Sequence, residues 1–354
     1  MQMIDFLKNI VMGEEQREEI RLVILDTSEH ENMPPDYIVE KDLYVSYVLD
    51  FLFNRSEIKD NIEFRGGTSL SKGYNLINRF SEDIDIVYKN ENFEKKIQYI
   101  LDNKDESGKP FTKTKRKKLV EDLREESKDY CKNTILPIIK KGIDSEVPGV
   151  FIYDFDDKTG SIFLNYDPIV DYENTYIKPS VRIEIGVREA WTPNESISLN
   201  SFIGTVNKEN ENFQDGWSFK VNVIKPERTF WEKVNILQQE SNRDESKDLP
   251  ERYSRHYYDI YKMVSTQYKK TAIKDIALLQ EVIKYTSILY EKNWAKIGEI
   301  KPGHFTLSPH SSTLELLKDD YKNMESMIYG EYPSFDEILE SVQKLEKELN
   351  TLTF

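Results

Sequence analysis

The chain has 354 residues, of which 32% are charged, and its formal net charge is −15. Its 12% aromatic content argues against disorder, its single cysteine excludes an internal disulfide framework, and no apolar run approaches the roughly 18 residues of a membrane span. We therefore expect a cytoplasmic protein of about two domains, without a membrane partner and without a broad nucleic-acid-binding surface.

The first 55 residues are predicted to be mainly helical, because apolar residues in 39–53 recur at the spacing of one helix face. Residues 61–67 (NIEFRGG) predict a short strand that ends in a glycine turn. A helix is predicted over 68–80, with four apolar side chains near one face: Leu70, Tyr74, Ile77 and Phe80. Residues 82–88 (EDIDIVY) then alternate with the period of a strand.

The middle of the chain is predicted to be helical and then rich in strands. Residues 92–141 are long, charged and largely helical in pattern. The predicted strands that follow are 149–155, 161–166, 180–187 and 219–224.

A helix is predicted after Pro226, with Thr229 and Glu232 in the spacing of a capping box. The polar segment 241–252 predicts a loop, and the remainder is predicted to be helical apart from 301–312. Together these elements predict an α+β protein in three parts. They are an N-terminal helical segment (1–55), a mixed-sheet core with flanking helices (56–226) and a mainly helical C-terminal domain (227–354).

Two acidic residues in the predicted strand 82–88 form the first candidate site. Asp83 and Asp85 are two positions apart, so both side chains leave the same strand face, while Ile84 and Ile86 point to the opposite, buried face. Paired carboxylates suit Mg²⁺, which is bound through a few carboxylates together with substrate phosphates. Two metals bridged by such a group support in-line phosphoryl displacement.

The glycine turn supplies the second half of this candidate site. Gly66 and Gly67 lack Cβ atoms, so the backbone can approach a ligand closely. A helix beginning near Thr68 would present free amides to a phosphate, with a hydroxyl from Ser69 and a charge from Lys72. A glycine turn or an Asp-x-Asp pair alone is weak evidence, whereas both within one strand–turn–helix–strand unit are far more specific.

Residues 64–87 (FRGGTSLSKGYNLINRFSEDIDIV) resemble the DNA polymerase β-like nucleotidyltransferase superfamily, which has a glycine-rich turn, a helix and an Asp-x-Asp strand. Further segments resemble the AbiEii/AbiGii toxin family of nucleotidyltransferases: VEKDLYVSYVL (39–49), PERTFWEKVNIL (226–237) and RYSRHYYDIYKM (252–263). Two details differ from the family pattern. The turn has Gly-Gly-Thr where Gly-Ser is commoner, and His256 follows Arg255 where an Asp is frequent.

This resemblance implies a toxin of a bacterial toxin–antitoxin or abortive phage-infection system, which binds an NTP with Mg²⁺ and transfers its nucleotide. It implies a nucleotidyltransferase fold, an antitoxin encoded nearby and, for some relatives, the acceptor end of tRNA as target. The family motifs correspond to Gly66, Gly67, Thr68, Ser69, Asp83, Asp85, Lys233 and Asp259.

Two later candidates also have interpretations independent of the family. Lys233 would lie near the start of its helix, where a cation is unfavourable unless it meets a triphosphate, but it could equally be an exposed surface lysine. Asp259 could orient Lys233 or a metal-bound group, or accept a tyrosine hydroxyl. His256 is a candidate base, although a packing histidine is commoner.

A third carboxylate, acting as metal ligand or base, is expected from the superfamily, and Glu184 is the favoured candidate. It shares a strand face with Arg182, so a cross-strand ion pair is the competing interpretation. Rival candidates in a more turn-like setting are Asp154, Asp156 and Asp157.

The only dense basic run is 113–118 (KTKRKK). Its five cations, Lys113, Lys115, Arg116, Lys117 and Lys118, form either a solvated helix face or a site for an RNA backbone. The leading hypothesis is thus a Mg²⁺-dependent nucleotidyltransferase that modifies an RNA 3′ end, with tRNA favoured. The alternatives are an NTP-binding sensing module without transfer, and transfer to a protein or small molecule.

Overall fold

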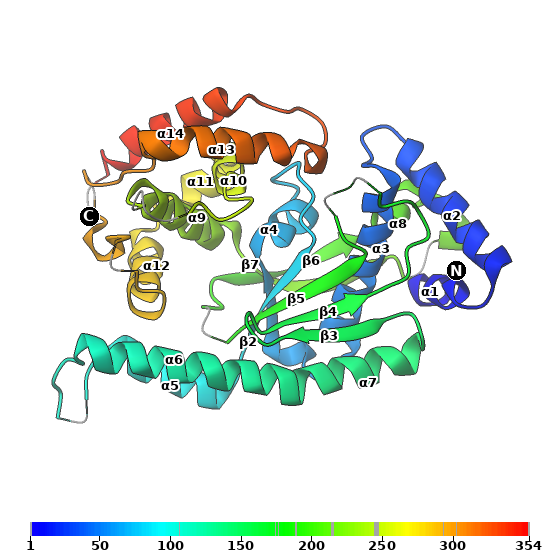
Figure 1. The fold of residues 1–354 in the computed structure, drawn as a ribbon, viewed down its shortest axis with the longest axis horizontal. Coiled ribbons are helices and arrows are strands. Elements are labelled where there is room, and N and C mark those ends of the chain that lie inside the picture. The colour runs from blue at the N-terminus through cyan, green and yellow to red at the C-terminus, as the bar shows by residue number, and fades with distance from the viewer. Residues whose placement is uncertain are drawn as a thin grey trace. The chain divides into compact units, whose positions relative to one another are not determined.

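The computed structural model describes residues 2–352 except 106, 174, 176, 188–189, 214–215, 244–247, 293 and 302. The chain forms two compact units (Figure 1). Unit 1 comprises Met1–Tyr74, Phe80–Phe93 and Asp122–Ile224, and unit 2 comprises Asn75–Arg79, Glu94–Glu121 and Lys225–Phe354. Residues 1–55 thus cluster with the sheet in unit 1, whereas two segments that precede Lys225 in the chain cluster with the C-terminal helices in unit 2.

Unit 1 is built on a seven-stranded mixed sheet of order β3-β4-β5-β2-β1-β7-β6. The strands are β1 (Ile62–Arg65), β2 (Asp83–Tyr88), β3 (Ile152–Asp156), β4 (Ser161–Asn165), β5 (Ser180–Gly186), β6 (Asn194–Asn200) and β7 (Ser218–Ile224). β2 lies beside β1 in antiparallel and beside β5 in parallel orientation. The central strand β2 therefore brings Asp83 and Asp85 between the glycine turn after β1 and Glu184 on β5.

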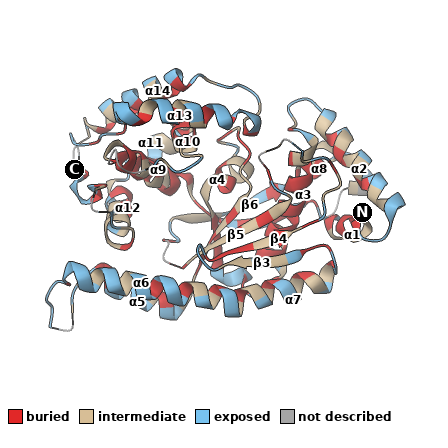
Figure 2. Cartoon of the chain, in the orientation of Figure 1, coloured by how far each residue is buried: buried red, intermediate tan, exposed pale blue. Residues whose placement is uncertain are grey.

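Helices cover this sheet and complete the hydrophobic core. They are α1 (Met3–Ile10), α2 (Glu14–Glu29), α3 (Asp36–Asp50), α7 (Leu136–Glu146) and α8 (Phe202–Val206), with π-helical turns η1 (Phe51–Arg55) and η4 (Cys131–Ile135). α3 contacts β5 and β7 and is buried along almost its whole length (Figure 2). The shorter turn η2 (Lys59–Asn61) lies between η1 and β1, and η5 (Glu211–Phe213) lies between α8 and β7.

Unit 2 is helical. Its helices are α9 (Pro226–Ser241), α10 (Arg255–Met263), α11 (Gln267–Ala272), α12 (Ile276–Leu289), α13 (Ser311–Asn323) and α14 (Phe335–Leu349), with 3₁₀ turns η6 (Ile297–Glu299) and η7 (Glu325–Met327). Most of α5 (Glu91–Asp102) and the first half of α6 (Lys113–Tyr130) also belong to it. α9 packs against α10, α11 and α12 and is the most buried helix among them. No helix in the described part of the chain is long and apolar enough to cross a membrane.

The α+β fold class is confirmed, but the predicted helix over 68–80 is wrong. The helical stretch comprises only α4 (Gly66–Thr68) and the π-helical turn η3 (Ser69–Gly73). Asn75 has a φ of 50°, the left-handed conformation that ends a helix, and Asn tolerates it better than most residues. The next residues leave the helix: Asn78 accepts a backbone hydrogen bond from Tyr329, and Arg79 bridges Ile328.

Two further details differ from the predictions. Helix α9 begins at Pro226 with Lys225 as its N-cap and no side-chain cap, so Thr229 lies buried inside the helix rather than in a capping box. Proline suits the first helical position because its missing amide would have no partner there. The edge strand β6 has a largely exposed, polar sequence, and its pattern was too weak to predict a strand.

Candidate active site

The turn after β1 and the second acidic residue of β2 touch one another. Arg65 is the register partner of Asp85, so Gly66 follows directly beside the Asp85 carboxylate. Gly66 has a φ of 80°, and a Cβ added there would overlap with Oδ2 of Asp85. A side chain at position 66 is therefore excluded twice, by backbone conformation and by the carboxylate. The glycine turn and the acidic strand form one compact site in unit 1.

The three predicted carboxylates lie on adjacent strands. Asp83 pairs in register with Arg182, and Asp85 with Glu184. Ile84 and Ile86 are buried on the opposite face, as the alternation predicted. Arg182 forms an ion pair with Glu184 and lies 4.0 Å from Asp83. Glu184 therefore lies beside Asp85, as a third carboxylate would, and it also forms an ion pair with Arg182. The Arg182 guanidinium lies among these acids.

The donor set fits Mg²⁺ better than a metal held by protein alone. Across the described residues, no three acidic, histidine or cysteine side chains stand close enough to hold a metal ion by themselves. Mg²⁺ is commonly bound by one or two carboxylates together with substrate phosphates and water. Asp83 and Asp85, hard oxygen donors beside a turn without side chains, match that demand. The rival acids on β3 and its turn bond to nearby Asn165, Thr159 and Lys132 instead.

The remaining residues of the glycine turn are engaged in local contacts. Thr68 donates its hydroxyl to the backbone carbonyl of Asp83, which ties the turn to β2. Ser69 is buried and donates to the carbonyl of Gly66. Lys72 is bound to the Asp42 carboxylate and to the carbonyl of Asn200. The turn is therefore held in place on several sides, and α4 starts without a side-chain cap.

Substitution of Gly66 by alanine should lower nucleotide binding by at least about tenfold, because the new methyl group must displace the Asp85 carboxylate. Gly149→Ala is the matched control: Gly149 has the same φ of 80°, but a Cβ there meets nothing within 4 Å. Both variants carry the strain of a left-handed alanine, and only the first disturbs the site. Equal nucleotide affinities of the two variants, measured by calorimetry, would contradict this assignment.

Unit 2 contains a buried charge cluster formed by Arg79, Lys233 and Asp259. Arg79 donates two hydrogen bonds, of 2.7 and 2.8 Å, to the two oxygens of Asp259. Nζ of Lys233 lies 2.6 Å from Oδ2 of Asp259. Lys233 is thus neither exposed nor near the helix start, contrary to the prediction, and Asp259 orients it. Both cations thus contact the same carboxylate, and all three side chains are buried.

The pKa values in the cluster follow from burial and these charges. Burial lowers the pKa of Lys233, although Asp259 opposes this effect. Arg79 and Lys233 hold the pKa of Asp259 well below its ordinary value against the opposing effect of burial. Burial together with Lys233 and Arg255 depresses the pKa of the half-buried His256 far below the usual range. His256 is therefore neutral at physiological pH and packs edge-on against Tyr253.

Sequence inspection missed several charged residues that support the site. Glu40, Lys41 and Asp42 are all buried in α3. Asp42 binds Lys72 and the amide of Phe202, and Lys41 binds Glu82 beside the acidic strand. Three consecutive charges inside an apolar helix were an available signal, since buried charges must be paired. Arg79 offered no such pattern.

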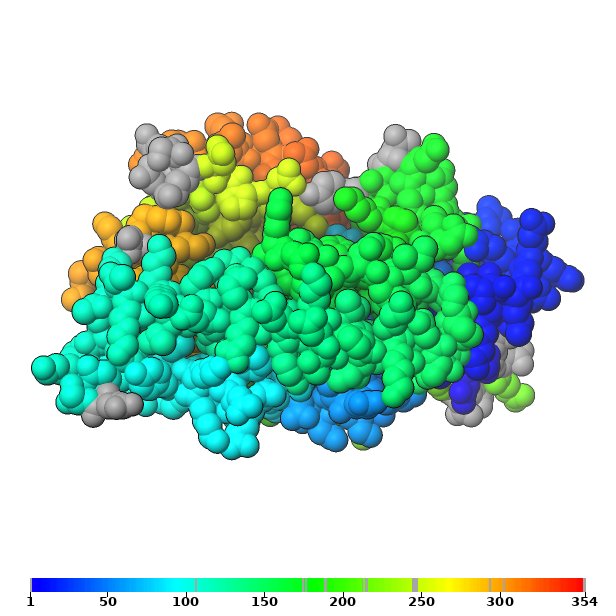
Figure 3. Space-filling model, turned by 60° about the horizontal axis from the view of Figure 1, so that its bottom comes forward, coloured from blue at the N-terminus to red at the C-terminus, as the bar shows by residue number. Residues whose placement is uncertain are grey.

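The basic run lies at the start of α6, at the molecular surface (Figure 3). Lys117 and Lys118 are exposed, and Lys115 lies 4.7 Å from the centre of the Phe111 ring. Lys113 and Arg116 both contact Glu291, at 3.6 and 2.7 Å. Some cations of the basic run therefore face the solvent, whereas Lys113 and Arg116 contact Glu291, just after the end of α12.

The family model described as "Nucleotidyl transferase AbiEii toxin, Type IV TA system" matches residues 50–341, which include the glycine turn, the acidic strand, Lys233 and Asp259. The chain belongs to the AbiEii nucleotidyltransferase toxin family. It is accordingly a nucleotidyltransferase toxin of a type IV toxin–antitoxin system, with a nucleotide substrate and an antitoxin partner.

Among solved structures, the chain is similar to MenT4, a nucleotidyltransferase toxin from Mycobacterium tuberculosis H37Rv. The similarity covers 94% of this chain and 90% of that chain, with a TM-score of 0.50 and 13% identity, and it supports the fold. No curated protein matches the chain by sequence.

Proposed function

We propose that this AbiEii-family toxin is a Mg²⁺-dependent enzyme that transfers a nucleoside monophosphate from an NTP to an RNA 3′ end, with tRNA as the favoured acceptor. The observation that supports it most is the packing of the Asp85 carboxylate against Gly66. This contact brings a carboxylate, which we propose as a metal ligand, beside a bare backbone turn, and the proposed reaction needs a cation and a phosphate held side by side.

In the proposed reaction, the 3′-hydroxyl oxygen of the acceptor bonds to the α-phosphorus, and the bond from that phosphorus to the oxygen bridging to the β-phosphate breaks. Pyrophosphate leaves with the electron pair. Gly66, Gly67, Thr68 and Ser69 form the turn that binds the triphosphate, and Asp83 and Asp85 would hold Mg²⁺. The bound cation would neutralise charge that develops on the phosphate oxygens.

Glu184 is the proposed third carboxylate of this site, and we assign it the role of accepting the proton of the attacking hydroxyl, since no three acids of the described residues are arranged to hold a metal ion. Its neighbour Arg182 contacts it directly and fixes its direction. Since Arg182 also receives support from Ser161, the guanidinium has a defined position among the acids. In this proposal Arg182 is a positioning residue.

Lys233 is proposed to neutralise charge on the triphosphate, with Asp259 and Arg79 holding its side chain. Lys72, proposed from the sequence as a further nucleotide-binding residue, is bound to Asp42 and Asn200. We propose that it acts on the nucleotide through the position of the turn. The antitoxin encoded nearby is the proposed regulatory partner.

The acceptor is tested by incubating the protein with total RNA and each of the four α-labelled NTPs. We expect label on RNA of tRNA size, and its loss when the RNA 3′ ends have been oxidised with periodate beforehand. Label on protein or on a small molecule would replace the RNA acceptor. Tight NTP binding without pyrophosphate release for any acceptor would support the sensing module instead.

A further inference from the structure

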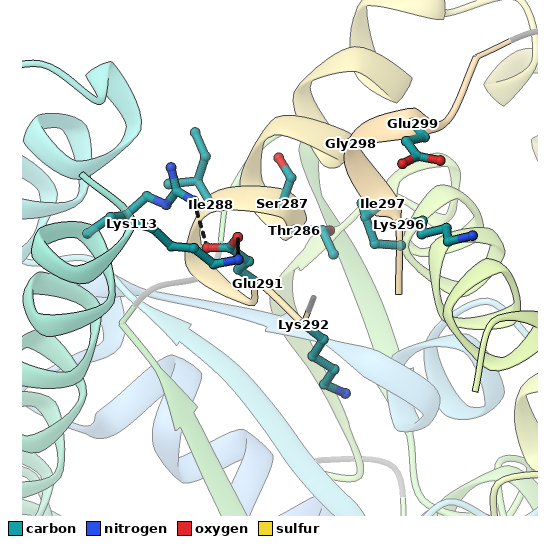
Figure 4. A pocket seen from close by; sticks show the side chains of 11 residues that line it. Lys113, Thr286, Ser287, Ile288, Glu291, Lys292, Lys296, Ile297, Gly298 and Glu299 are labelled. Carbon is teal, nitrogen blue, oxygen red and sulfur yellow. Dashed lines mark hydrogen bonds and ion pairs between the residues drawn. The ribbon is translucent and has the colours of Figure 1, made fainter. Parts of the chain in front are cut away.

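A pocket of about 360 Å³ lies within unit 2 and is formed by elements other than those of the glycine turn (Figure 4). Its walls come from the first turn of α6, the end of α12 and the 3₁₀ turn η6. Thr286, Ser287 and Gly298 also contribute to the lining. The pocket is thus open, polar and formed by segments far apart in the sequence.

The charges around this pocket are mainly positive. Four cations line it, Lys113, Arg116, Lys292 and Lys296, against two acids, Glu291 and Glu299. A local excess of positive charge is unusual in a chain whose net charge is −15. Such a concave cationic surface attracts phosphate groups at long range.

The cations are only partly neutralised by their neighbours. A single carboxylate, Glu291, serves both Lys113 and Arg116. Nε of Arg116 is buried and has no hydrogen-bond partner among the described residues. The buried Nε lacks the hydrogen bond that would offset its desolvation, so Glu291 satisfies only part of this guanidinium.

Two local features oppose folding and are understandable if the pocket has an anionic ligand. The first turn of α6 contains no acidic residue, and its cations face the positive end of the helix dipole. Lys296 has a φ of 49°, a left-handed conformation that is unfavourable for a lysine. Burial and the nearby Arg243 also lower the pKa of Lys292, an effect that a bound phosphate would reverse.

We infer that this pocket binds backbone phosphates of the RNA acceptor, at a site separate from the glycine turn. The cations surround the pocket instead of converging: in Figure 4, Lys113 faces Glu291, whereas Lys296 lies on the other side beyond Ile297. This spread suits successive phosphates of a polynucleotide better than one compact anion. The choice of RNA as the ligand rests on the proposed function. The inference that the pocket binds phosphate groups rests only on the cations that line it.

Three variants of the full chain test the inference. Lys296→Gly removes one cation and replaces it with the residue that best tolerates a left-handed φ, so folding is preserved. Arg116→Gln removes a second cation of the lining, and Glu291→Gln removes the acid that competes with phosphate. Lys322→Gln is the control, since this lysine of α13 is 75% exposed and pairs only weakly with Asp319.

The measurement is the affinity of each variant for fluorescently labelled total tRNA and for NTP, over a series of salt concentrations. At about 0.15 M salt, Lys296→Gly and Arg116→Gln should each weaken tRNA binding about fivefold and lower the salt slope by about one, as expected for one lost phosphate contact. Glu291→Gln should tighten binding. Lys322→Gln should change it less than about twofold, and NTP affinity should stay constant throughout.

The inference is overturned if Lys296→Gly and Arg116→Gln behave like Lys322→Gln. A change in NTP affinity in place of tRNA affinity would overturn the RNA assignment and identify the phosphate as the nucleotide's. Failure of the proposed function is distinguishable, because it appears as absent transfer by the wild-type protein whether or not these variants change tRNA binding.

Discussion

Replacing Asp83 with asparagine should lower the rate of nucleotidyl transfer by about 10³-fold or more. A bound divalent cation supplies several kcal/mol of transition-state stabilisation, and each roughly 1.4 kcal/mol corresponds to a factor of ten in rate. The asparagine would keep the shape of the side chain but lose the charge that holds the cation. The same loss is expected for Asp85→Asn, because Asp85 is the acid that lies against Gly66.

The fold should tolerate the Asp83 substitution. Asparagine has nearly the same shape as aspartate and can still accept hydrogen bonds, and the Asp83 side chain is about one-fifth exposed. The melting temperature should therefore change by no more than about 2 °C. Asp157→Asn, on an exposed turn of the same unit, is the control and should keep full activity. Substantial residual transfer by folded Asp83→Asn would remove this residue from the metal site.

Replacing Asp259 with alanine should destabilise the protein by about 3–5 kcal/mol, the range expected when one partner of a buried ion pair is removed. Arg79 and Lys233 would then both lose the buried carboxylate that they contact. Urea unfolding of the full chain measures this loss. The control is Glu348→Ala, which removes a partly exposed acid from Lys269 in the same unit and should cost about 1 kcal/mol or less.

A second substitution separates charge repulsion from lost packing. Adding Lys233→Met to Asp259→Ala removes one of the two cations that contacted Asp259. The double variant should therefore be more stable than Asp259→Ala. If Asp259→Ala costs no more than Glu348→Ala, or if the added Lys233→Met lowers stability further, the buried charges are not coupled as described.

The same ion pairs predict a pH dependence of stability. The pKa of Asp259 is depressed in the folded state by Arg79 and Lys233, so its contribution is fully present above its unfolded pKa of about 3.9. It is lost as the pH falls through the folded-state value. The difference in stability between wild type and Asp259→Asn should therefore be constant from about pH 8 to 5 and shrink only in more acidic solution. A difference that shrinks near neutral pH would contradict the ionised pair.

The strand β2 and the glycine turn could be predicted from the sequence because their local patterns are strong. The alternation of Asp83, Ile84, Asp85 and Ile86 specified both a strand and its buried face. The glycine pair predicted a close backbone approach, and the approaching group proved to be Asp85 itself. Strand pairing, which brings Glu184 beside Asp85, could only be assumed from the family resemblance, because register between distant segments leaves no local pattern.

The failures have physical causes of the same kind. The apolar spacing from Leu70 to Phe80 imitates a helix face, but Leu70 and Ile77 are buried in different units. A left-handed Asn75 ends the helix between them. Lys233 looked like a surface lysine because nothing in its neighbourhood along the chain indicates Asp259 or Arg79. Charge pairs between distant residues are set by tertiary packing.

The central proposal is nucleotidyl transfer at the glycine turn that lies against Asp85. Its most direct test uses one NTP labelled in two separate preparations, at the α- or at the γ-phosphate, with wild-type protein and purified tRNA. The account predicts that the α-label becomes covalently attached to the tRNA while the γ-label is released in pyrophosphate. Attachment of the γ-label, or of neither label under conditions where NTP is bound, would contradict it.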